Sequence, residues 1–155
     1  MKVDFVNPFV GSAFSVLQMV IGDSPKRGEL AARTKLFKSQ PVTIVIGVVG
    51  AVHGQVLYGM SQETARRLSG AMIGQEVPEL DELAISALAE LGNMITGNAA
   101  SQLAQAGYIA DLAPPAVIQG PEIIILTVEA ALVVPVITGC GTIEINIALE
   151  EARQA

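Results

Sequence analysis

Ser86, Glu90 and Asn93 have a spacing that could bring a carboxylate and an amide together on one helix. With a rotation of about 100° per residue, Glu90 lies about 40° to one side of Ser86 around the axis and Asn93 about 20° to the other side. A carboxylate can pair with a cation. A carboxamide can hold a water molecule, because it both donates and accepts hydrogen bonds. These two tasks suit hydrolysis of a phosphoryl group that is carried by another molecule.

The opposite side of this helix is predicted to be apolar and to pack against the rest of the chain. The apolar residues that cluster about 140–200° from Ser86 are Ala84, Leu88, Leu91 and Ile95. Gly97 falls on the polar stripe, and Ala89 is a further small residue in the helix. Gly92 and Gly97 each weaken a helix by up to about 1 kcal/mol relative to alanine. We therefore expect these small residues to let another backbone come close.

The composition predicts one domain over residues 1–155 with a core of small and branched aliphatic side chains. Hydrophobic residues make up 51% of the chain and charged residues 15%, so the chain should fold. The net charge is −6, and no basic patch is interleaved with aromatic residues. Nucleic-acid binding is therefore not expected.

No targeting or membrane-spanning segment is expected from the sequence. The first residues lack the pattern of a signal peptide, and the apolar run 42–52 is too short to span a membrane. The run 123–138 is interrupted by Glu129 and Pro135 and suits strands better. The single cysteine, Cys140, excludes an intramolecular disulfide and gives no zinc-binding spacing. We expect a cytoplasmic protein.

The order of the expected elements predicts an α+β fold, a mostly antiparallel sheet with helices packed on one face. Helices are expected at 7–21, with Asn7 as N-cap and Pro8 in the first turn, at 62–73 after the N-cap Ser61, and at 79–106. Strands are expected at 42–49, 54–60, 123–128, 130–137 and 142–149. Residues 29–39 should form an edge strand or a loop, and Pro114-Pro115 an extended crossing.

Other polar residues have structural interpretations. His53, the only histidine, is expected in a hairpin turn beside Gly54, and no Ser-His-Asp triad can be recognised around it. Cys140, between two glycines, is expected to be a packed thiol or a turn residue. The pairs Lys26-Arg27 and Arg66-Arg67 are expected to be solvated, with contact to an acidic partner as the alternative.

The pattern Ser-x-x-x-Glu-x-x-Asn at 86–93, followed by Gly97, resembles the active-site helix of the CheC/CheX family of response-regulator phosphatases. Segment 111–120 is similar to the segment that follows this helix in the family. Residues 43–50 and 54–58 are similar to its central hairpin, and residues 6–12 to its first helix. The resemblance covers most of the chain and is nearest to the CheX branch, whose members carry one such helix.

The resemblance implies a CheC-like fold and an enzyme that hydrolyses the phospho-aspartate of a CheY-type receiver domain. In this interpretation Asn93 positions the attacking water, and Glu90 pairs with a lysine of the receiver. Ser86, Ala89 and Gly97 contact the partner. The chain binds no cofactor or metal, and Mg²⁺ is expected in the receiver. The resemblance also implies a homodimer, formed through sheet edges or the C-terminal strands.

Two other functions stay open at this level. A non-catalytic adaptor would bind receivers through the same helix without releasing phosphate. A purely structural dimer would have no receiver partner, and Glu90→Ala would then change nothing. Phosphate turnover separates the phosphatase from the adaptor, and receiver binding separates the adaptor from the structural dimer.

Overall fold

Residues 3–153 are described by the computed structural model, and they form three helices and ten strands. The helices are α1 (Val3–Ile21), α2 (Gln62–Ile73) and α3 (Glu82–Gln105). The strands of the first half are β1 (Lys26–Arg27), β2 (Ala31–Arg33), β3 (Leu36–Ser39), β4 (Val42–Gly50) and β5 (Val52–Met60). Those of the second half are β6 (Ala110–Leu112), β7 (Ala116–Gln119), β8 (Ile123–Leu126), β9 (Ala131–Thr138) and β10 (Gly141–Glu151).

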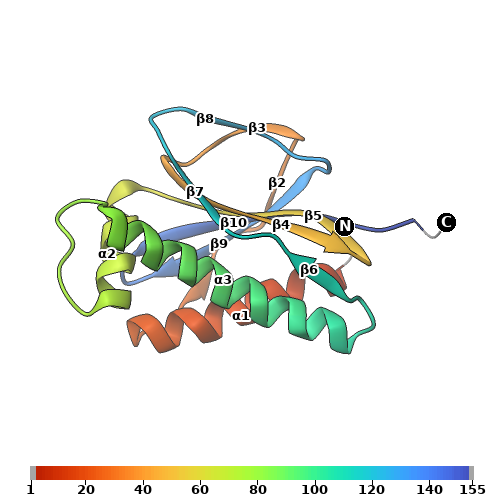
Figure 1. Cartoon of the computed structure of the whole chain (residues 1–155), viewed down its shortest axis with the longest axis horizontal. Helices are drawn as coiled ribbons and strands as arrows, with labels where there is room; N and C mark the ends of the chain where they lie inside the picture. Colours follow the sequence, from red (N-terminus) through yellow and green to blue (C-terminus); the bar gives the residue numbers. More distant parts are fainter. Residues whose placement is uncertain (1–2, 154–155) are drawn as a thin grey trace.

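Eight strands form one sheet, in which every pairing is antiparallel. Its order is β1-β9-β10-β5-β4-β6, with β2 also paired to β9 and β7 also paired to β4. The three helices lie together on one face of this sheet, and the two-stranded ribbon β3–β8 lies over the other face (Figure 1). The predicted α+β fold, with helices on one face, is confirmed.

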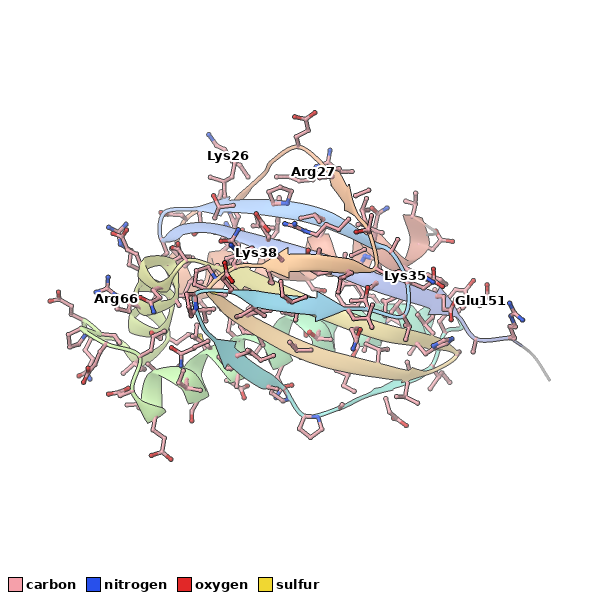
Figure 2. All side chains as sticks on the ribbon, turned by 90° about the horizontal axis from the view of Figure 1, so that it is seen from above. Lys26, Arg27, Lys35, Lys38, Arg66 and Glu151 are labelled. Carbon is pink, nitrogen blue, oxygen red and sulfur yellow. The ribbon has the colours of Figure 1, made fainter. Side chains whose placement is uncertain are left out.

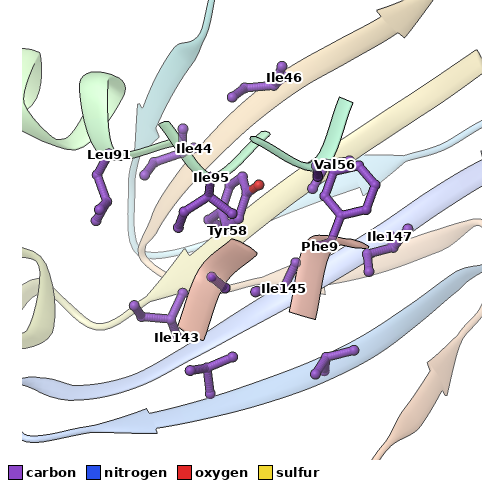
Figure 3. Packing of buried hydrophobic residues seen from close by; sticks show 14 of the residues in the cluster. Phe9, Ile44, Ile46, Val56, Tyr58, Leu91, Ile95, Ile143, Ile145 and Ile147 are labelled. Carbon is purple, nitrogen blue, oxygen red and sulfur yellow. The ribbon is translucent and has the colours of Figure 1, made fainter. Parts of the chain in front are cut away.

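The core lies between the sheet and the helices and is built from aliphatic side chains with few aromatics. Figure 3 shows Phe9 of α1 and Leu91 and Ile95 of α3 packed over the strands. The buried strand residues beneath them include Ile44, Ile46, Val56, Tyr58, Ile143, Ile145 and Ile147. Apolar burial on this face therefore fixes which side of α3 points inward.

The first helix begins earlier than its predicted start at residue 7. It runs from Val3, so Asn7 is not its N-cap and Pro8 lies inside the helix. Phe5 and Phe9, one turn apart, are both buried, and the Phe5 ring meets Tyr108 edge-on with centroids 5.0 Å apart. Burial of this N-terminal turn compensates for the backbone hydrogen bond that Pro8 cannot donate.

The start of the long helix was also predicted wrongly, at residue 79. Helix α3 begins at Glu82, because the side chain of Asp81 accepts a hydrogen bond from the Ala84 N–H at 2.9 Å and caps the first turn. Helix α2 matches its prediction. Ser61 caps it by accepting from the Thr64 N–H, and Gly74 ends it with a left-handed φ of 86°.

Residues 29–39 form two separate short strands, β2 and β3. The extended crossing at Pro114-Pro115 lies between two further strands that the sequence did not predict. Both β6 and β7 pair with β4, and the prolines interrupt them because proline has no N–H for a sheet ladder.

His53 lies within strand β5 and not in a turn, which corrects the prediction. The chain bends earlier, at Ala51, between the end of β4 and the start of β5. His53 is opposite Glu150 of β10 in the register, and its Nε2 is 3.0 Å from the Glu150 carboxylate. A cross-strand partner of this kind explains why a polar residue occupies a strand at this position.

Candidate active site

Helix α3 presents the predicted polar stripe on its outer side. Ser86, Glu90 and Asn93 are all exposed. Gly97 is half-buried on the same stripe, and Ala89 is half-buried beside it. The residues predicted to face inward, Ala84, Leu88, Leu91 and Ile95, are all buried. The structure therefore places the carboxylate of Glu90 and the amide of Asn93 within one turn of each other on an open helix surface.

The two glycines of the helix have different surroundings. Gly92 is buried, and a Cβ atom on it would lie 2.9 Å from Cγ2 of Ile44 on β4. The close neighbour of Gly92 is therefore this chain's own sheet and not a partner. A Cβ atom on Gly97 would meet nothing within 4 Å. Gly97 thus leaves open space on the stripe, as a docking surface for another protein requires.

The strands β6 and β7 lie beside α3 at this edge of the sheet. At the N-terminal end of the helix, a hollow of about 290 Å³ is lined by Gln62, Arg66, Pro78, Glu79, Leu80 and Gln119. The guanidinium of Arg66 is 3.5 Å from the carbonyl oxygen of Pro78, and Arg67 pairs with Glu63 at 2.7 Å. Arg66 therefore supplies the basic side chain among the residues that line this hollow.

Glu90 forms no ion pair with any residue in the part of the chain that the structure describes. The basic residues of segment 26–38 lie elsewhere, as Figure 2 shows from the ribbon side. Lys26 and Arg27 form β1, at the sheet edge opposite to β6, and Lys38 lies on the ribbon strand β3. The Glu90 carboxylate is therefore free to meet a cation on another molecule.

No metal centre accompanies this stripe. Within residues 3–153 there is no group of three or more His, Cys, Asp or Glu side chains that could hold a metal ion. Cys140 is half-buried in the β9–β10 turn, and desolvation raises the pKa of its thiol. A raised pKa lowers the fraction of the thiol that is ionised at neutral pH, which works against a nucleophilic role for Cys140.

Sequence reasoning missed two polar residues behind the stripe, Tyr58 and Thr96, whose hydroxyl oxygens are 2.7 Å apart in the core. The available signal was a threonine directly after Ile95, which was predicted to face inward, because a buried hydroxyl needs a partner. Its partner on β5 could be found only in the folded structure.

The architecture and the exposed stripe together define a CheC-like protein. The structure is similar to that of a CheC-like superfamily protein from Shewanella, with a TM-score of 0.85 and 30% identity over 97% of this chain and 99% of that chain. It is also similar to the crystal structure of the CheX-CheY-BeF3-Mg²⁺ complex from Borrelia burgdorferi. That match has a TM-score of 0.79 and 28% identity over 97% of this chain and 100% of that one.

Sequence comparison defines the family more narrowly. Residues 42–137 match the family model described as chemotaxis phosphatase CheX. The chain is also 35% identical over 137 residues to the CheY-P phosphatase CheX of Thermotoga maritima, which covers 88% of each chain. This chain belongs to the CheX family of chemotaxis phosphatases.

Proposed function

We propose that this chain is a protein-aspartate phosphatase that dephosphorylates a CheY-type receiver domain. The observation that carries the proposal is the exposed Glu90–Asn93 pair on a helix whose other face is fully packed. The relative from Thermotoga maritima is a CheY-P phosphatase, and the Borrelia burgdorferi relative was crystallised with CheY. Both findings support a phosphorylated receiver as the substrate.

Asn93 is the proposed catalytic residue that holds the attacking water. An aspartyl phosphate is an activated acyl phosphate, so the enzyme needs to supply no nucleophile of its own. It has to hold a water in line with the phosphorus while negative charge shifts to the leaving carboxylate. The exposed amide of Asn93 can accept a hydrogen bond from that water and orient its lone pair, and its charge does not change with pH.

Glu90 is the proposed docking residue, because a carboxylate would be repelled by a phosphoryl group. It would pair with a lysine of the receiver and draw that lysine away from the phosphate. Ser86, Ala89 and Gly97 would form the rest of the contact, since they are small and lie on or beside the same stripe. The receiver would supply Mg²⁺, in agreement with the ion in the Borrelia burgdorferi complex.

The first experiment measures the decay of a radiolabelled, phosphorylated receiver domain from the same organism, with Mg²⁺, in the presence of this chain or its Asn93→Ala variant. The wild-type chain should speed the decay. The rate constant with the variant should be about 10²–10³-fold lower than with the wild-type chain, by analogy with loss of one oriented polar group. The variant should still bind the receiver. Binding without accelerated decay in the wild type would favour the adaptor function.

We further propose that the chain is a cytoplasmic homodimer. Helix α1 has the length and hydropathy of a membrane span, but its apolar residues Phe5, Phe9, Ala13 and Leu17 are buried in the core. On the outer face of the ribbon, Leu36, Ile124 and Leu126 are exposed, and such a patch favours a protein contact. Light scattering after size exclusion should give twice the mass of the chain, and a monomer mass would contradict this.

A further inference from the structure

A chain of two hydroxyl groups joins the motif helix to the sheet beneath it. Tyr58 on β5 and Thr96 on α3 are both buried, and Oγ1 of Thr96 is also 2.7 Å from the carbonyl oxygen of Gly92. A carbonyl oxygen only accepts hydrogen bonds, so the Thr96 hydroxyl donates to Gly92. The Tyr58 hydroxyl must then donate to Thr96, 2.7 Å away. These bonds run from β5 into the turn of α3 that carries Asn93.

The surroundings of this hydroxyl pair are apolar. Figure 3 shows Tyr58 beneath Leu91 and Ile95, with Ile44 and Ile143 nearby. Burial raises the pKa of the Tyr58 phenol above its usual range, so the phenol stays a neutral donor in ordinary buffers. A hydrogen bond in a region of low dielectric constant is strong, and a lost partner there is costly.

The hydrogen bonds constrain the orientation of the helix on the sheet, which apolar packing alone does not do. Contacts of Leu91 and Ile95 with the sheet favour burial of this side of α3, but hydrophobic attraction has no preferred direction. Hydrogen bonds depend on both distance and angle, so they resist sliding and rotation of the helix. Gly92 precedes Asn93, and Thr96 follows it by three residues, so the bonded turn is the one that carries the catalytic amide.

We propose that Tyr58 and Thr96 are positioning residues for the phosphatase reaction, which hold Asn93 at the distance from the receiver that in-line attack by water requires. This inference rests on the proposed function. Neither residue touches the substrate, since both are buried behind the stripe. A displacement of about 1 Å at a catalytic group can lower the rate by about 10²-fold, so a fixed helix turn has a direct effect on turnover.

The deciding variant replaces both hydroxyl residues, as Tyr58→Phe with Thr96→Val. Replacing both partners by apolar groups of the same shape can leave stability nearly unchanged, whereas Thr96→Val alone leaves the buried Tyr58 hydroxyl unpaired. We expect the double variant to unfold near the wild-type urea midpoint, while its kcat falls about tenfold and its KM changes less than about twofold. Thr96→Ser keeps the hydroxyl and should retain kcat.

Ser69→Ala is the matched control. Ser69 is buried in α2, and its hydroxyl lies 2.8 Å from the Ala65 carbonyl oxygen, the same one-turn bond that Thr96 makes in α3. The Ser69→Ala variant should be less stable than the wild type, and its kcat should be unchanged. Wild-type kcat in the double variant, or an equal loss of kcat in Ser69→Ala, would overturn the positioning role.

A second readout needs no receiver. In the double variant, amide hydrogen exchange at residues 92–97 should be faster than in the wild-type chain, whereas exchange in α2 should stay unchanged. Unchanged exchange at 92–97 would overturn the inference, whatever the phosphatase assay shows. A wild-type chain that does not speed receiver dephosphorylation would instead overturn the proposed function.

Discussion

A Cβ atom on Gly92 would lie 2.9 Å from Cγ2 of Ile44 and 3.3 Å from Cδ1 of Ile46, so α3 and β4 approach more closely than a side chain at residue 92 permits. Ile44 is branched at Cβ, and its Cγ2 methyl group cannot move away without rotation of the whole side chain. Asn93 is the next residue. The height of the helix that carries this proposed catalytic residue therefore depends on glycine at position 92.

Gly92→Ala should destabilise the fold and lower activity. Alanine improves helix propensity by about 1 kcal/mol, but overpacking of a close contact costs about 1–3 kcal/mol. The clash with Ile44 should outweigh the gain and should push the Asn93 turn outward. Urea denaturation and the receiver dephosphorylation rate measure the two effects. A variant that is more stable than the wild type would show that the sheet moves away at little cost.

Gly97→Ala should have the opposite effect on stability. A Cβ atom there meets nothing within 4 Å, so the helix should gain about 0.5–1 kcal/mol. Because Gly97 lies on the stripe that we propose as the docking surface, the added methyl group should raise KM for the phosphorylated receiver. Thermal unfolding and dephosphorylation kinetics give both quantities.

Gly11→Ala is the matched control for Gly97→Ala. Gly11 also lies inside a helix, α1, and a Cβ atom on it meets nothing within 4 Å. It should raise stability by a similar amount and leave KM unchanged. Equal KM values for both variants would place Gly97 outside the contact with the receiver.

The exposed stripe could be predicted from sequence because it depends only on helical periodicity. Ser86, Glu90 and Asn93 repeat at the period of one helix face, and the apolar residues opposite them repeat in the same way. The start of α3 was less predictable, since both Pro78 and Asp81 are typical of helix starts. The hydrogen bond between Asp81 and the Ala84 N–H decides between them.

Features that depend on distant partners could not be read from local sequence. The strands β6 and β7 have only three and four residues, and each forms because β4 offers a free edge. The Tyr58–Thr96 bond joins residues 38 positions apart. The placement of His53 also depends on a distant segment, since β5 pairs with β10 and His53 lies opposite Glu150 in the register.

Glu129→Gln should stabilise the protein at neutral pH and have little effect in acid. A hydrogen bond and charge repulsion from Glu150 raise the pKa of the Glu129 carboxyl, mainly through the hydrogen bond. A raised folded-state pKa means that the folded state binds the proton more tightly. The stability that Glu129 adds to the folded state is therefore fully present below the unfolded pKa of about 4.3. It is lost as the pH rises through the folded pKa.

Glutamine at residue 129 can still donate to Glu150 but carries no charge, so the repulsion above the folded pKa disappears. Urea midpoints of the wild type and Glu129→Gln should differ at about pH 7 and converge at about pH 3. A difference in urea midpoint that is the same at both pH values would show that Glu150 does not affect the ionisation of the Glu129 carboxyl.

Glu90→Gln should weaken receiver binding and leave the fold intact. Glu90 is exposed and unpaired within residues 3–153, so its replacement should change the free energy of unfolding by less than about 0.5 kcal/mol. Truncation of one partner of a desolvated interfacial ion pair costs about 2–5 kcal/mol of binding free energy. Calorimetric titration of the receiver, at low and high salt, measures this loss.

Glu122→Gln removes the same charge from the ribbon side of the sheet, and this control variant should bind the receiver as the wild type does. If both variants bind equally well, Glu90 meets no cation on the receiver, and docking must depend on the small residues of the stripe.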